Sequence, residues 1–341
     1  MNLAKKLLLL IFLCSIGGLS AAERVNCTVC SKKIRGRYII DSRKRAFCSE
    51  KCFEQTLPTC ANCRKLCRGN FLKVKSESFC SRQCADNKLL PRCSRCSKPC
   101  RKFMVLPTGY GTFTYCIDCY KLDKCLVCCQ RAKKLYLQSN GNKLCRYCNR
   151  DVITNLAQLQ SLFNEVRNTL HKNFNFPADH PITLEMRSFT EQEKSSLHGG
   201  NLFGLYNYQG KIVRKGKLFS GKKTPEIKFR NEHCSIIILG YLPRRKAAEA
   251  IAHELAHDYM KHRWFFIKDE KIKEGFAEFI AAQYNTISGS QQWNICMEKN
   301  PDKVYGDGYR EMCKLYKQGS FPALFRLFDR INLQDTPSEY R

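Results

Sequence analysis

The chain has 341 residues, 23 cysteines and a formal net charge of +29, because 59 Lys+Arg outnumber 30 Asp+Glu. A field this positive favours polyanionic or acidic partners. After residue 22 no run is long and apolar enough to cross a bilayer, which takes about 20 residues, so a downstream membrane anchor is excluded.

The first 22 residues have the three parts of a secretory signal peptide. Lys5 and Lys6 precede an apolar core from about residue 7 to residue 19, and small residues follow at positions 20–22. The core is shorter than a transmembrane helix requires. The pattern therefore predicts a cleaved leader and a protein that is secreted or periplasmic.

Residues 23–150 contain four tandem repeats, each with two pairs of cysteines. The first cysteines of successive repeats are 33, 33 and 32 residues apart, and spacers of 16 to 19 residues separate the pairs. Spacers such as FLKVKSESF are typical of short hairpins, and two knuckles joined by a hairpin bring four thiolates to one tetrahedral point. The predicted structural zinc ligands are Cys27, Cys30, Cys48 and Cys52; Cys60, Cys63, Cys80 and Cys84; Cys93, Cys96, Cys116 and Cys119; and Cys125, Cys128, Cys145 and Cys148.

Disulfides are the alternative for these cysteines, because an exported protein meets an oxidising compartment. We favour zinc, since paired C-x-x-C at a fixed period is a metal-binding spacing and bound thiolates are protected. Cys67, Cys100 and Cys129 remain outside the four sets. Cys67 and Cys100 occupy equivalent places in successive repeats, so a shared role and a mutual bridge both stay open.

The positive charge is concentrated in the same block. Residues 23–150 carry 29 Lys+Arg against 8 Asp+Glu. Their aromatic side chains stand mostly beside cysteines, which favours hairpin cores over a base-stacking platform. We therefore favour an acidic protein substrate or partner, and nucleic acid stays open as the less favoured partner. The alternative is that lysine and arginine only keep a domain with little core in solution.

A globular pattern replaces the repeats at residue 151. Apolar residues recur at helical spacing over 151–176, which predicts a helical linker. Residues 177–341 are long enough for a second domain with a sizeable core. In it we expect a strand at ITLEMRSF, a loop-rich polar stretch to about Lys228, and a short strand SIIIL at 235–239.

The SIIIL run lies just before the stretch that carries the chemistry. An extended substrate needs its scissile carbonyl held still, and main-chain pairing with an edge strand does this without reading side chains. We expect SIIIL to be that edge, with Ile236, Ile237 and Ile238 as substrate-binding residues. Their branched apolar side chains suit an interior strand equally well, so both placements stay open.

Residues 253–257 read HELAH. On an α-helix, His253 and His257 project from one face and can reach one ion, with Glu254 beside them. Two imidazoles with an adjacent carboxylate are typical of a zinc site that activates water. The spacing predicts His253 and His257 as zinc ligands and Glu254 as the general base.

A second predicted helix follows HELAH and supplies the remaining carboxylates. Its apolar residues repeat at helical spacing, and Glu274 and Glu278 share the other face one turn apart. We expect Glu274 to be the third zinc ligand and Glu278 to orient a ligand histidine. Gly275 costs about 1 kcal/mol relative to alanine in a helix, which predicts close approach to the HELAH helix.

The run HCSIIILGYLPRRKAAEAIAHELAHDYMKH, followed by KEGFAEFIAAQY, resembles the peptidase domain of the plant LIM-domain peptidases, which are growth-regulating, ubiquitin-activated enzymes. The match is specific over residues 230–285 and only architectural over the cysteine block. It implies a zincin-like fold and zinc-dependent peptide cleavage. The linkers of 7, 8 and 5 residues between repeats and the lack of a ubiquitin-interacting helix depart from the family, so ubiquitin dependence is not carried over.

Together these patterns predict an α+β protein in which LIM-like four-cysteine modules precede a zincin-like (Glu-zincin) domain. The expected activity is that of an exported zinc metallopeptidase, with one catalytic and about four structural zinc ions. The alternative is a basic zinc-finger binding protein for acidic protein or nucleic acid, with an inactive peptidase-like domain. The oxyanion donor is left among His262, Tyr284, Tyr305 and Tyr309.

Overall fold

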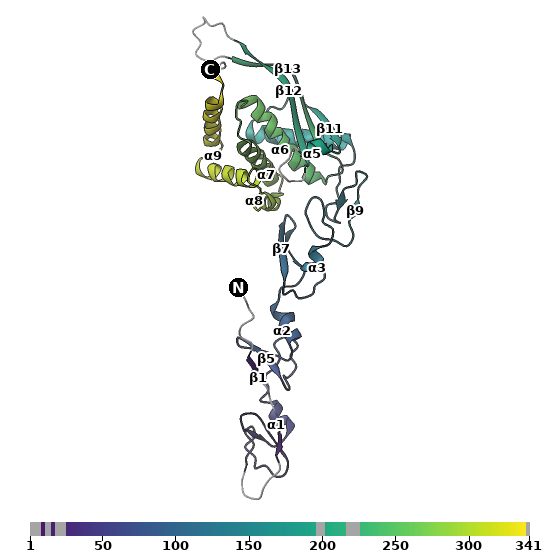
Figure 1. Cartoon of the computed structure of the whole chain (residues 1–341), viewed down its shortest axis with the longest axis vertical. Coiled ribbons are helices and arrows are strands. Elements are labelled where there is room, and N and C mark those ends of the chain that lie inside the picture. The colour runs from purple at the N-terminus through teal and green to yellow at the C-terminus, as the bar shows by residue number, and fades with distance from the viewer. Residues whose placement is uncertain (1–7, 11–14, 18–24, 196–201, 216–225, 339–341) are drawn as a thin grey trace. The chain divides into compact units, whose positions relative to one another are not determined.

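The computed structural model describes residues 8–10, 15–17, 25–195, 202–215 and 226–338 (Figure 1). The chain divides into two compact units. The first comprises Met1–Met104 and Thr114–Ile117, and the second comprises Val105–Phe113 and Asp118–Arg341. The fourth cysteine repeat therefore belongs to the same unit as the HELAH segment, whereas the sequence placed a boundary at residue 150.

The four repeats contain the hairpins expected from their spacers. In the first two repeats Ser49 and Ser81 cap the short helix after the hairpin by accepting the backbone N–H of Cys52 and Cys84. The elements are β3 (Tyr38–Ile40), β4 (Ala46–Phe47) and α1 (Glu50–Glu54); β5 (Phe71–Val74), β6 (Glu77–Phe79) and α2 (Arg82–Leu89); β7 (Phe103–Thr108), β8 (Gly111–Cys116) and α3 (Ile117–Tyr120); and β9 (Tyr136–Leu137) and β10 (Lys143–Leu144).

The residue before the third cysteine of each repeat is buried. These residues, Phe47, Phe79, Tyr115 and Leu144, are at most 2% exposed. They form small cores under the cysteine pairs, in agreement with the expectation that aromatic side chains here pack rather than stack on bases.

The predicted signal peptide lies largely outside the described residues. Of its span the structure describes β1 (Leu8–Leu10), which pairs with β5, and β2 (Ser15–Gly17), which pairs with β3. Export remains a prediction from the sequence. None of the described helices is both long and apolar enough to span a membrane.

The second unit is built on a three-stranded sheet in the order β11-β13-β12. Strand β11 (Thr183–Arg187) runs parallel to β13 (Glu226–Leu239), and β12 (Gly204–Lys215) runs antiparallel to it. The long β12 and β13 occupy much of the stretch predicted to be loop-rich, so that prediction was wrong for these residues.

The expected edge position of SIIIL is also wrong. Strand β13 is the central strand, and Ile236, Ile237 and Ile238 each have a partner on β11 and on β12. They are at most 2% exposed. With both sides paired, their main chain has no free groups for a substrate, and their side chains fill the core. In the described sheet the outer strands β11 and β12 each have a free side, and of these two β12 lines the pocket described below.

Helices pack against this sheet and enclose one hydrophobic core with it (Figure 1). They are α4 (Leu156–Phe174), α5 (Glu191–Ser195), α6 (Arg244–Arg263), α7 (Glu270–Ile287), the 3-10 turn η1 (Gln291–Trp293), α8 (Asn294–Glu298) and α9 (Tyr305–Asp335), which is kinked at Ser320. Helix α4 buries Leu159, Phe163 and Val166 in this core. The predicted linker helix is thus part of the domain.

Gly275 marks a close helix contact, but the partner differs from the one expected. A Cβ at Gly275 would lie 2.6 Å from the backbone carbon of Gly308 on α9, and a Cβ at Gly308 would lie 2.6 Å from the carbonyl oxygen of Lys271. Two glycines therefore let α7 and α9 touch through their backbones. The HELAH helix α6 is not the neighbour that requires this glycine.

Gly275→Ala should therefore destabilise the protein although alanine favours helices. The added methyl would meet backbone atoms that cannot rotate away, and such overpacking costs about 1–3 kcal/mol. Chemical denaturation of the full chain measures this loss. Gly240→Ala is the matched control, because the nearest side-chain atom to its Cβ is 3.8 Å away. Equal stability of the two variants would contradict the backbone contact.

The fourth repeat packs on the start of α6. Trp293 packs in the small core of this repeat, and its ring centroid lies 3.2 Å from the guanidinium carbon of Arg245. The ring of Tyr110, from the hairpin of the third repeat, meets the same indole edge-on at 4.6 Å. The side-chain amide of Asn140 donates to the carbonyl of Gly240 at 2.8 Å. These contacts join the cysteine module to the turn that introduces the HELAH helix.

Candidate active site and metal centres

Helix α6 carries HELAH as predicted. It begins after Pro243, and twelve of its residues are buried, among them five alanines, Ile251 and Leu255. A helix with this much of its surface buried lies in the interior of a domain. The two histidines four residues apart therefore lie inside the protein, on one face and at the wall of a cavity.

Helix α7 brings Glu274 to the two histidines. His253 Nε2 lies 3.2 Å from Glu274 Oε2 and 3.2 Å from His257 Nε2, and His257 Nε2 lies 3.4 Å from Glu274 Oε2. Asp269 caps this helix by accepting the N–H groups of Lys271 and Ile272, which fixes where its first turn starts. The three residues predicted to hold the catalytic metal thus face one another.

The triangle of ligand atoms has the size that zinc requires. A tetrahedral ion bound about 2.0–2.1 Å from each ligand separates nitrogen and oxygen ligands by about 3.3–3.4 Å. The observed separations of 3.2, 3.2 and 3.4 Å match this value. Two imidazoles and one carboxylate also leave a fourth position open, which is typical of catalytic rather than structural zinc.

The charges at this site favour a cation. Burial works against the charged imidazole of His253, but the hydrogen bond with Glu274 and the nearby carboxylates raise its pKa to about 9. Burial opposes ionisation of Glu274 as well, yet the charge of His257 and hydrogen bonds with both histidines lower its pKa. Burial raises the pKa of Glu254 and of Glu278. Glu254 is buried and Glu274 and Glu278 are partly buried, so three carboxylates beside two imidazoles leave an excess of negative charge that a divalent ion would neutralise.

Glu254 lies next to this triangle and against strand β12. Its side chain is buried, and a Cβ at Gly204 would come within 2.5 Å of Glu254 Oε1. Glycine at this position therefore lets the strand approach the carboxylate. A backbone hydrogen bond from Tyr206 favours the ionised form of Glu254. The predicted general base on helix α6 is thus held against strand β12.

Glu278 occupies the position of an orienting residue. Its Oε1 lies 3.5 Å from His253 Nδ1, the ring nitrogen that faces away from Glu274. A carboxylate there fixes the tautomer and the orientation of a ligand histidine. Glu278→Gln should weaken binding of the catalytic metal by about 10- to 100-fold without removing it, which competition with a zinc indicator would measure. Unchanged affinity would mean that Glu278 does not orient His253.

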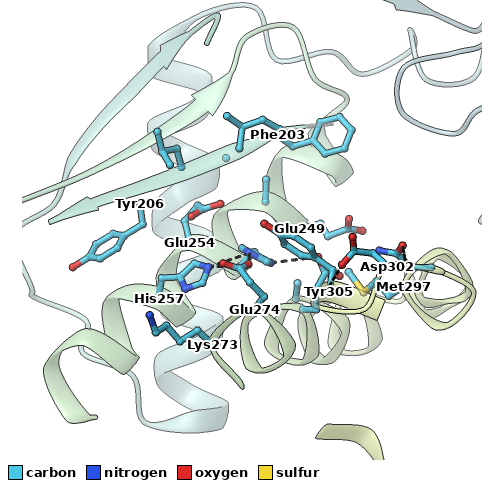
Figure 2. Close-up of a pocket in the computed structure, with 18 of the residues that line it drawn as sticks. Phe203, Tyr206, Glu249, Glu254, His257, Lys273, Glu274, Met297, Asp302 and Tyr305 are labelled. Carbon is cyan, nitrogen blue, oxygen red and sulfur yellow. Dashed lines mark hydrogen bonds and ion pairs between the residues drawn. The ribbon is translucent and has the colours of Figure 1, made fainter. Parts of the chain in front are cut away.

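A pocket of about 870 Å³ opens beside these residues. Figure 2 shows Glu254, His257 and Glu274 gathered around one point in it, with Tyr206 and Tyr305 nearby. Its wall also includes residues from three other places: Leu126, Val127 and Cys129 of the fourth repeat; Phe203 just before β12 with Gly204 and Leu205 at its start; and Met297 in α8 with Asn300, Pro301 and Asp302 just after it.

The pocket narrows the choice of oxyanion donor. Of the four candidates, Tyr305 lines the pocket, and its ring stacks on His253 with the centroids 6.4 Å apart. Burial raises the pKa of Tyr305, which keeps the hydroxyl protonated and able to donate. The lining residues do not include His262, Tyr284 or Tyr309.

Strand β12 and the fourth repeat are parts of the pocket that the sequence did not reveal. The run FGLYNY at 203–208 is rich in aromatic and aliphatic residues, which favours a strand over a loop. No pattern in the sequence links Leu126 and Val127 to the HELAH segment, since this contact is between residues more than a hundred positions apart.

The cysteines gather in the four predicted sets. In each set the four sulfurs lie within 4.8 Å of one another and could hold a metal ion: Cys27, Cys30, Cys48 and Cys52; Cys60, Cys63, Cys80 and Cys84; Cys93, Cys96, Cys116 and Cys119; Cys125, Cys128, Cys145 and Cys148. Neighbouring sulfurs such as those of Cys63 and Cys80 are 3.6 Å apart. A tetrahedral zinc with bonds of about 2.3 Å separates sulfurs by about 3.8 Å, close to this distance and far from a disulfide bond of about 2.05 Å.

The three cysteines of residues 23–150 that lie outside the sets are free thiols that differ in their surroundings. Cys67 and Cys100 are buried, and burial raises the pKa of both thiols. They are unpaired in the structure, so the mutual bridge left open by the sequence is not formed. Cys129 lines the pocket.

The purified protein should contain at least five zinc ions per chain, counting one for each four-cysteine set and one at the HELAH site. Mass spectrometry of metal content and a thiol count after denaturation in the presence of chelator would measure this. About one zinc together with few titratable thiols would instead establish disulfides in the repeats.

Comparisons with known proteins assign no family to the chain. A scan against protein-family models finds no match, and no curated protein shows significant similarity to it in sequence.

Proposed function

We propose that the chain is a zinc-dependent metallopeptidase that cleaves protein substrates. The observation that carries the proposal is the triangle of ligand atoms from His253, His257 and Glu274, with sides of 3.2–3.4 Å, next to the buried Glu254 and open to a pocket. The resemblance of residues 230–285 to plant LIM-domain peptidases supports the same reading.

The residues divide the chemistry among them. Zinc, when bound, polarises a carbonyl group and makes water more acidic. Glu254 takes a proton from the attacking water and later passes it to the leaving amine. The hydroxyl of Tyr305 donates a hydrogen bond to the oxygen that becomes negative in the transition state. Glu278 keeps the ring of His253 in place.

The free side of β12 is the platform that we propose for the substrate. Residues 204–206 line the pocket, and β12 is paired with β13 on one side only in the described sheet. An extended peptide on the other side would gain main-chain hydrogen bonds and would place its scissile bond over Glu254. This strand takes the role that the sequence assigned to Ile236, Ile237 and Ile238.

The basic repeats would recruit the substrate. With 29 Lys+Arg and 8 Asp+Glu over residues 23–150, they attract acidic proteins, and the attraction extends over about 8 Å at physiological salt. The predicted leader would place the enzyme in a secreted or periplasmic location. We propose no role for ubiquitin.

Incubation of the full chain with an unfolded protein tests the proposal. Mass spectrometry should find new peptide termini that are absent when the Glu254→Gln variant, purified in parallel, replaces the parent protein. Fragments produced equally by both proteins would come from a contaminating protease. If a fully zinc-loaded protein releases no peptides but binds acidic protein in a salt-dependent way, then the chain is a binding protein with an inactive domain.

A further inference from the structure

A second group of metal-ligating side chains lies in the same unit as the HELAH site. It consists of His180, which precedes β11, Cys234 on β13, and Asp258 and His262 on α6. One ligand atom from each lies within 4.8 Å of the other three. None of these residues belongs to the catalytic triangle, although Asp258 directly follows His257 in the sequence.

The carboxylate of Asp258 is the centre of the group. Its Oδ2 lies 3.1 Å from His180 Nδ1, and its Oδ1 lies 3.5 Å from His262 Nδ1. The hydroxyl of Tyr206 donates to Asp258 Oδ1 at 3.0 Å and lies 3.5 Å from the sulfur of Cys234. Both Asp258 and Cys234 are 3% exposed. A buried carboxylate of this kind requires compensation by positive charge.

The two nitrogens of His262 both face oxygen acceptors. Nε2 lies 3.0 Å from Oε1 of Glu232, and Nδ1 lies 2.7 Å from the backbone carbonyl of Asp258. A neutral imidazole carries one N–H, so it can satisfy only one of these two oxygens. Either a second proton on the imidazole or a metal ion bound to Nδ1 would resolve this lack of an N–H for the second oxygen. A carboxylate on the far nitrogen is the usual partner of a metal-bound histidine.

We infer that His180, Cys234, Asp258 and His262 form a second site for a divalent metal ion of the zinc class, with Glu232 as the carboxylate that orients His262. Two imidazole nitrogens, one thiolate and one carboxylate oxygen are a donor set that suits zinc. Four protein ligands leave no open position, which is typical of a structural ion.

An ion at this site would connect elements that position the HELAH helix. The ion would tie the central strand β13 to helix α6 one residue after the ligand His257, and Tyr206 would connect it to the strand that borders the pocket. Such a link would hold the HELAH helix at a fixed distance from the sheet. The inference does not depend on the proposed peptidase activity, because metal can occupy this site whether or not the chain cleaves peptides.

Metal content of the full chain tests the inference. The parent, Cys234→Ala and His180→Gln proteins would be prepared with zinc chloride, freed of excess ion and measured by mass spectrometry. Each variant should contain one zinc fewer per chain than the parent. Cys313→Ala is the matched control, because Cys313 on α9 is also a thiol whose pKa is raised by burial and it lies outside every metal group named above. That variant should keep the parent's zinc content.

Equal zinc content in the parent, Cys234→Ala and His180→Gln would overturn the inference. The contacts of His262 would then be explained by a second proton on its imidazole, shared with Asp258. Anomalous scattering at the zinc edge from crystals of the parent protein covers the case in which a variant fails to fold. A peak within about 2.0–2.3 Å of the four ligand atoms supports the site. A peak at the HELAH site without one here contradicts it.

Discussion

Replacing Glu254 with glutamine should lower kcat for cleavage of protein substrate by about 10²- to 10⁴-fold, the range that a general base contributes. Glutamine has nearly the same volume but cannot accept the proton of the attacking water. His253, His257 and Glu274 are untouched, so the content of catalytic zinc should stay the same. Cleavage rates at saturating substrate, together with metal content, measure both effects.

The stability of this variant provides an independent check. Burial and the charge of Glu274 raise the pKa of Glu254, so the ionised carboxylate destabilises the folded state at neutral pH. A neutral amide removes that cost, so the melting temperature of the metal-free protein should not fall. Loss of both activity and stability would mean that Glu254 supports the fold and would not show that it acts as a base. Unchanged activity would contradict the mechanism.

Replacing Glu274 with alanine should remove both the catalytic zinc and measurable cleavage. This carboxylate is the third corner of the ligand triangle, and without it two histidines alone would hold the ion in a buried site. The zinc content should fall by one ion per chain, and the four-cysteine sets should keep theirs. Metal analysis and the cleavage assay measure the two losses on the same sample.

Glu270→Ala is the control for this variant. Glu270 lies one turn earlier on the same helix, is exposed, and pairs with Lys273, so its loss should leave both zinc and activity unchanged. If Glu274→Ala keeps the catalytic zinc, then the proposed ligand set is wrong. Glu278 could replace Glu274 only after rearrangement, because it faces the other nitrogen of His253.

The sequence predicted those features that depend on local spacing. Helix periodicity located α6 and α7, and the spacing of HELAH to Glu274 brought three side chains together as expected. The same holds for the cysteine sets, because a pair of knuckles and its hairpin form one local unit. These predictions required no knowledge of how distant segments pack.

Strand order and helix neighbours depend on distant segments, and here the sequence predicted less. Three isoleucines in a row suit an edge strand and an interior strand alike, and only pairing with residues 183–187 and 204–206 places Ile237 in the centre. The glycine at position 275 predicted a close helix contact, but the sequence did not indicate that its partner is Gly308. The group around Asp258 was missed because its members come from three separate stretches of the chain.

The knuckle between Cys125 and Cys128 has a consequence for how the proposed peptidase would respond to zinc shortage. Leu126 and Val127 lie between two ligands of the fourth set and also form part of the pocket wall. Loss of the zinc ion from the fourth set would therefore loosen the pocket wall, even while the zinc ion at His253 and His257 stayed bound. Inactivation by a chelator should then proceed in two phases, one for each kind of ion. Loss of either the HELAH ion or the ion of the fourth set would abolish cleavage. The cleavage rate would therefore depend more steeply on the external zinc concentration than that of a peptidase with one essential ion.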